Sequence, residues 1–95
     1  MKLVYCIGCG DLLQLDVTET KYCTCGNAGG KYHEGGLHAE YWGEWAVPVG
    51  IDSRDFHLAI DNQPEKGKGK EFIAFVIPKE CPTFKKVEDK ELNDV

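Results

Sequence analysis

The sequence predicts an α+β fold with a small, mainly antiparallel sheet and one short helix. Three observations predict it: two close cysteine pairs near the N-terminus, several short apolar runs typical of strands, and a single segment with helical periodicity. The chain has 95 residues, enough for one domain. We therefore expect a single domain at residues 1–84, followed by a charged, frayed tail at residues 85–95.

Composition and charge exclude several classes of protein. Apolar residues make up 42% and charged residues 28%, a mixture typical of soluble globular proteins. No apolar run approaches the ~20 residues that a membrane-spanning helix needs. The N-terminus lacks the uninterrupted apolar stretch of a signal peptide, so we expect a cytoplasmic protein. The formal net charge of −5 disfavours a general binder of nucleic acids or anionic membranes.

Four of the five cysteines form two close pairs, and each pair is followed directly by glycine. The pairs are Cys6 with Cys9 and Cys23 with Cys25. An odd total and tight spacing fit a metal site better than a disulfide framework. Such turns, or knuckles, point two sulfurs at one place, and the 13 residues between the pairs allow one hairpin to bring them together. The spacing therefore predicts a zinc-ribbon-like start, with one structural Zn²⁺ held by four thiolates.

The second pair departs from the commoner Cys-x-x-Cys spacing, which leaves two alternatives open. His33 or His38 would replace one of its sulfurs, or the four thiolates would hold iron in a rubredoxin-like, redox-active site. Whether zinc is held by four thiolates or by three thiolates and one imidazole, a full tetrahedral shell leaves no position for substrate. The zinc is therefore expected to be structural.

Three short strands are expected around the cysteine pairs, at residues 2–5, 12–17 and 20–23. The side chains expected to cover the metal are Tyr5, Leu13 and Tyr22. The glycine-rich segment from Gly26 to Lys31 predicts a turn. It lacks the spacing of a phosphate-binding P-loop, and an anion-binding nest beside Lys31 is the alternative to simple turn chemistry.

Two more strands are expected at residues 37–42 and 45–49, separated by a turn. A helix should follow from Ser53 to Asn62, with Asp52 as its N-cap and Asp55 in its first turn. Its apolar residues recur at helical spacing, so we expect the helix to pack on the sheet.

Residues 65–71 alternate lysine and glycine between glutamates and predict a solvated loop. Residues 72–77 are apolar without interruption, which predicts a central strand buried on both faces. Residues 81–84 should then dock against the body of the domain.

Four blocks of the sequence resemble a family of small bacterial and phage-encoded proteins of unassigned function. The blocks read CIGCGDLLQL, YCTCGNAGGKY, AEYWGEWAVPVGID and FIAFVIPKECPTF. The resemblance covers nearly all of residues 1–84. It implies a zinc-ribbon-like start on a compact α+β body, in the cytoplasm of a bacterium or a phage-infected host, and it implies no activity or substrate.

Three aromatic residues within five positions favour binding of a protein partner: Tyr41, Trp42 and Trp45. Alternation along strands makes all three rings hard to bury in a small core, and an exposed ring is typical of a binding hot spot. Burial in the core or over the metal is the alternative. A negative net charge suits an inhibitor that competes with nucleic acid for a basic partner. We therefore expect a non-catalytic, zinc-stabilised binding protein, such as a phage-encoded inhibitor or adaptor.

Two other binding functions stay open. Small-molecule or nucleotide binding would use the glycine-rich segment. Weak nucleic-acid binding would need several lysines to share one face: Lys2, Lys21, Lys31, Lys66, Lys68 and Lys70.

An enzyme is not expected. Cys81 would need His33, His38 or His57 as a base, and nothing in the spacing brings them together. The acidic residues show no paired arrangement suited to acid–base catalysis.

Overall fold

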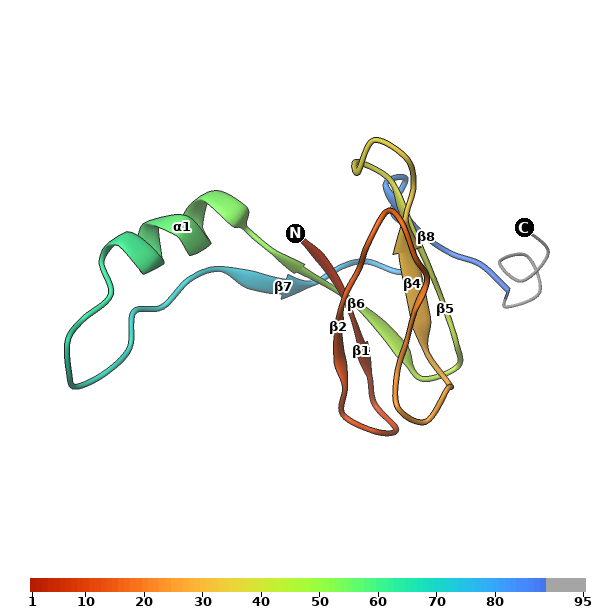
Figure 1. The fold of residues 1–95 in the computed structure, drawn as a ribbon, viewed down its shortest axis with the longest axis horizontal. Helices are drawn as coiled ribbons and strands as arrows, with labels where there is room; N and C mark the ends of the chain where they lie inside the picture. Colours follow the sequence, from red (N-terminus) through yellow and green to blue (C-terminus); the bar gives the residue numbers. More distant parts are fainter. Residues whose placement is uncertain (89–95) are drawn as a thin grey trace.

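The computed structural model describes residues 1–88 and divides the strands between two four-stranded sheets (Figure 1). The first sheet has the order β2 (Leu12–Gln14), β1 (Lys2–Cys6), β6 (Ala46–Ile51) and β7 (Ala74–Val76). The second has the order β3 (Lys21–Tyr22), β4 (Gly29–Tyr32), β5 (Ala39–Trp42) and β8 (Phe84–Lys86). All neighbours are antiparallel except β5 and β8. The mainly antiparallel character is confirmed, but two sheets stand where one was predicted.

The core is shared between the two sheets. Val4 and Cys6 on β1 belong to the same buried cluster as Tyr41 on β5 and Phe84 on β8. The Tyr41 and Phe84 rings meet edge to face, with centroids 4.9 Å apart. Each sheet therefore buries an apolar face against the other, which is why the short strands form two layers.

Gly29 and Gly30 lie in strand β4, so the turn predicted for residues 26–31 is too long. Gly29 pairs with Trp42 across the second sheet. A Cβ at Gly29 would come within 2.7 Å of Trp42 Cε2 and 2.6 Å of the Lys21 carbonyl oxygen. The glycine therefore makes room for the indole of the neighbouring strand.

The helix α1 (Ser53–Asp61) begins as predicted and ends one residue earlier. Asp52 is its N-cap and accepts a hydrogen bond from the Asp55 backbone N–H at 3.0 Å. The expected packing of the helix on the sheet is wrong. Figure 1 shows α1, the loop after it and β7 as an arm (residues 52–76) that extends beyond the second sheet and is joined to the first sheet where β7 pairs with β6. Phe56 instead meets Phe72 of the returning segment, with ring centroids 4.7 Å apart.

Residues 72–77 do not form a central strand. Only Ala74–Val76 are in β7, which lies at the outer edge of the first sheet, and all three are exposed. Ile77 alone in this run is buried. The prediction fails because the run lies on the arm, beyond the region that the second sheet covers.

Strand β8 extends past residue 84, the predicted end of the domain. Lys85 and Lys86 belong to β8 and pair with Glu40 and Tyr41 of β5. The rest of the predicted tail, residues 89–95, lies outside the described residues. Within residues 1–88, no helix has the length and apolar composition needed to cross a membrane.

Candidate metal centre

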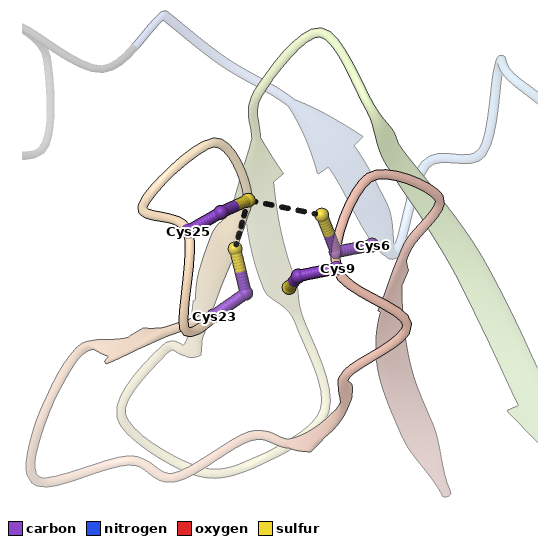
Figure 2. A group of neighbouring side chains, drawn as sticks. All are labelled: Cys6, Cys9, Cys23 and Cys25. Atoms are coloured by element: carbon purple, nitrogen blue, oxygen red, sulfur yellow. Dashed lines mark hydrogen bonds between the residues drawn. The ribbon is translucent and has the colours of Figure 1, made fainter.

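The structure brings four cysteine sulfurs together from two turns (Figure 2). All four Sγ atoms, of Cys6, Cys9, Cys23 and Cys25, lie within 4.8 Å of one another. Cys25 Sγ is 3.7 Å from Cys6 Sγ and 3.5 Å from Cys23 Sγ. A tetrahedral site with metal–sulfur bonds of ~2.3 Å has sulfur–sulfur edges of about 3.8 Å. The cluster therefore has the dimensions of a site for a single ion, and all four residues are free thiols.

The first knuckle joins the end of β1 to the start of β2. Gly10 N–H donates to the Cys6 carbonyl at 2.8 Å, and Cys6 N–H donates to the Asp11 carbonyl at 2.9 Å. Gly10, directly after the second cysteine, has a φ of +78°, a left-handed conformation that glycine adopts without steric cost. This closed turn holds Cys6 and Cys9 on the same side.

The second knuckle follows β3. Cys23 N–H donates to the Ala28 carbonyl at 3.0 Å, and Gly26 N–H donates to the Cys23 carbonyl at 3.1 Å. Gly26 has a φ of +79°, so both knuckle glycines adopt the left-handed conformation. The Asn27 side-chain amide lies 3.6 Å from Cys25 Sγ as a donor. The Cys-x-Cys spacing is thus compatible with two sulfurs that face the first knuckle.

A carboxylate links the two knuckles. Asp11 Oδ2 accepts hydrogen bonds from the Thr24 backbone N–H at 2.6 Å and the Thr24 hydroxyl at 2.5 Å. These hydrogen bonds lower the pKa of Asp11. Asp11 was not among the residues predicted to take part in the site. The available signal was an acidic residue directly after the first knuckle and a threonine between the second pair of cysteines.

The thiols of the cluster differ in acidity. The Cys9 backbone N–H lowers the pKa of Cys6, but burial and the neighbouring thiols raise it further, to about 11. The Asn27 backbone N–H, helped by the neighbouring thiols, lowers the pKa of Cys25 to about 7. Cys25, the exposed member, is therefore a stronger acid than the buried Cys6.

Neither histidine proposed as a substitute ligand belongs to the cluster. His33 Nε2 instead lies 2.6 Å from Glu40 Oε1. The geometry therefore favours four sulfur ligands over three sulfurs and an imidazole.

Among the side chains predicted to cover the metal, Leu13 packs against the core cluster that contains Cys6 and Cys23.

The three aromatic residues predicted to bind a partner have different environments. Tyr41 and Trp42 are 2% and 1% exposed, so they belong to the core and cannot contact a partner. Both can be buried because the second sheet is covered on both faces at β5, with Phe84 against Tyr41 and Tyr22 against Trp42. Trp45 is 43% exposed and lies beside the first knuckle.

The lysines considered for an anion or nucleic-acid surface are dispersed. Lys31 is on β4 of the second sheet, whereas Lys66, Lys68 and Lys70 are in the loop between α1 and β7. Figure 1 shows this loop at the far end of the arm, away from β4. Lys21 forms an ion pair with Glu19 at 2.7 Å. These positions do not supply one basic face.

Cys81 is half-buried and packs against the core. Its Sγ lies 3.5 Å from the Thr83 hydroxyl, which together with the Thr83 backbone N–H lowers the pKa of the thiol. This placement agrees with docking of residues 81–84 against the body. A non-catalytic role for Cys81 stays a prediction.

No protein-family model, curated protein or solved structure matches the chain. The resemblance to small bacterial and phage proteins therefore rests on the sequence blocks alone. Fold and site together define a small two-sheet protein with a four-cysteine cluster able to hold a metal ion.

Proposed function

We propose that this protein is a small zinc-stabilised module that acts by binding another protein and carries out no catalysis. One observation carries the metal part of the proposal: four cysteine sulfurs, all within 4.8 Å of one another, from two zinc-ribbon-like knuckles. Four thiolates complete a tetrahedral zinc shell and leave no position for water or substrate. Zinc in such a shell stabilises structure.

The position of the cluster supports a structural role for the ion. Cys6 ends β1 of the first sheet, and Cys23 directly follows β3 of the second. An ion bound to both would cross-link the two sheets at one end. The hydrophobic core of this chain is small, so metal binding and folding should be coupled.

The proposed contact surface consists of Ile7 and Trp45, which are 64% and 43% exposed. The Ile7 backbone N–H donates to the Trp45 carbonyl at 3.0 Å, so the two residues are fixed side by side. The Trp45 ring lies against Gly8, where a Cβ would be 2.5 Å from Trp45 Cζ3. A tryptophan held on a metal-clamped turn is pre-organised for binding, which reduces the entropy lost on association.

The partner proposed for this surface is a basic protein with an apolar pocket. The net charge of −5 favours such a partner electrostatically. In this proposal the protein acts as an inhibitor or adaptor that is encoded by a phage. It rests on the charge and on the sequence resemblance.

The test compares capture of a partner from bacterial extract by the tagged full-length chain and by two variants. Trp45→Ala should abolish capture while keeping the fold and the bound metal. Leu37→Ala, an equally apolar truncation at a 65% exposed position in the β4–β5 loop, is the control and should keep capture. A partner retained equally by Trp45→Ala would exclude the proposed surface.

A further inference from the structure

Strand β7 leaves one edge of the first sheet open. Among the described strands its only neighbour is β6. Residues 72–77 contain no charged residue and no proline, the usual protections of an exposed edge. Their side chains are also exposed: Phe72 39%, Ile73 58%, Phe75 51% and Val76 70%. An apolar, unprotected edge strand is a surface suited to further strand pairing.

The hydrogen bonds to β6 define which backbone groups of β7 face outward. Ile77 N–H donates to the Pro48 carbonyl at 2.9 Å, and the Ile73 carbonyl accepts from Asp52 N–H at 3.0 Å. Residues 73, 75 and 77 therefore direct their backbone groups toward β6. Because antiparallel ladders alternate, Ala74 and Val76 direct their N–H and C=O groups to the open edge.

We propose that two copies of the chain pair antiparallel through β7, about a two-fold axis at Phe75. In this register Ala74 exchanges both backbone hydrogen bonds with Val76 of the partner subunit, and the symmetry repeats the pair. Phe75 faces Phe75 of the partner subunit in a non-hydrogen-bonded pair, where Cα atoms are ~4.5 Å apart and side chains approach closely. The two first sheets join into one sheet of eight strands.

The strand is suited to a second copy because it is self-complementary. Its two outward-facing residues flank a central aromatic residue, so a two-fold axis satisfies every outward backbone group. The same register places Ile73 opposite Ile77 of the partner subunit, so no charged residue lies within the paired segment of residues 73–77.

The exposed area indicates a weak dimer. Four side chains, each about half-exposed, offer roughly 400 Å² of apolar surface per copy, since a fully buried aromatic side chain covers ~200 Å². With all of this surface covered, two copies would bury about 800 Å² of apolar surface, below the ~1,200 Å² at which stable specific interfaces begin. We therefore expect a dimer that dissociates on dilution into the micromolar range.

The test is sedimentation equilibrium of the metal-loaded full chain over a range of concentrations up to about 0.5 mM. The wild-type mass should rise from 10.6 kDa to twice that value. Phe75→Lys places two like charges opposite each other at the two-fold axis, so this variant should remain at the monomer mass. Ala74→Pro, which removes an outward N–H while leaving the ladder to β6 intact, should do the same.

The matched control is Leu58→Lys, because Leu58 on α1 is also 51% exposed and gains the same charge. It should dimerise like the wild type, and circular dichroism should show that all three variants are folded. A wild-type chain that stays monomeric at 0.5 mM would overturn the proposal. So would dimers of Ala74→Pro, or a Leu58→Lys variant that is monomeric. None of these outcomes bears on Trp45 or on the metal, so the two proposals fail independently.

Discussion

Asp11 and Thr24 join the two cysteine turns through a single carboxylate oxygen, which accepts one hydrogen bond from the Thr24 backbone and one from its hydroxyl. In the folded chain this link places the second knuckle opposite the first and so orients the four sulfur ligands toward one another. Outer groups that orient ligands in this way commonly contribute 10–100-fold to metal affinity.

Asp11→Ala should therefore weaken zinc binding by about 10-fold, because the second knuckle loses its attachment to the first. Competition with a chromogenic chelator measures the affinity. The control is Asp16→Ala, since Asp16 accepts the same two kinds of hydrogen bond from Thr18, both at 3.0 Å, away from the cysteines. Equal affinities for the two variants would show that the Asp11–Thr24 link does not position the site.

Replacing one ligand should affect folding as well as metal binding. Cys9→Ser removes one thiolate, and we expect loss of bound zinc together with loss of the cooperative thermal transition. Cys81→Ser is the control, because Cys81 lies outside the cluster, and it should keep both. A folded Cys9→Ser protein with unchanged metal content would refute the four-thiolate site.

The contact between Gly29 and Trp42 limits the size of the side chain that position 29 can hold. Gly29→Ala should lower the free energy of unfolding by about 1–3 kcal/mol, because its Cβ would press on the indole and on the neighbouring backbone. Urea denaturation measures the change. Gly69→Ala faces open space and should change stability by less than about 0.5 kcal/mol. Equal stabilities would show that the Trp42 ring shifts without cost.

Features determined by local chemistry were predictable from the sequence. The two knuckles follow from close cysteine pairs, each with a glycine that takes positive φ. The helix start follows from Asp52 and Asp55, whose hydrogen bond spans only three residues. Such features depend on neighbours along the chain, which a single sequence displays.

Features determined by distant neighbours were not predictable. Whether residues 72–77 form a central or an edge strand depends on what lies beyond β7, and the sequence does not record that. Gly29 was predicted to lie in a turn, because the sequence does not show that Trp42 lies opposite it in the second sheet. Tyr41 and Trp42 are both buried because covering side chains lie on both faces of the second sheet, an arrangement that alternation along one strand does not reveal.

Native mass spectrometry of the untagged chain, recorded with and without chelator and paired with circular dichroism, tests the central claim most directly. The proposed site predicts one zinc ion per chain, and it predicts that chelation removes the ion and the folded structure together. A folded chain without metal, or a chain that holds iron, would contradict the structural zinc centre at Cys6, Cys9, Cys23 and Cys25.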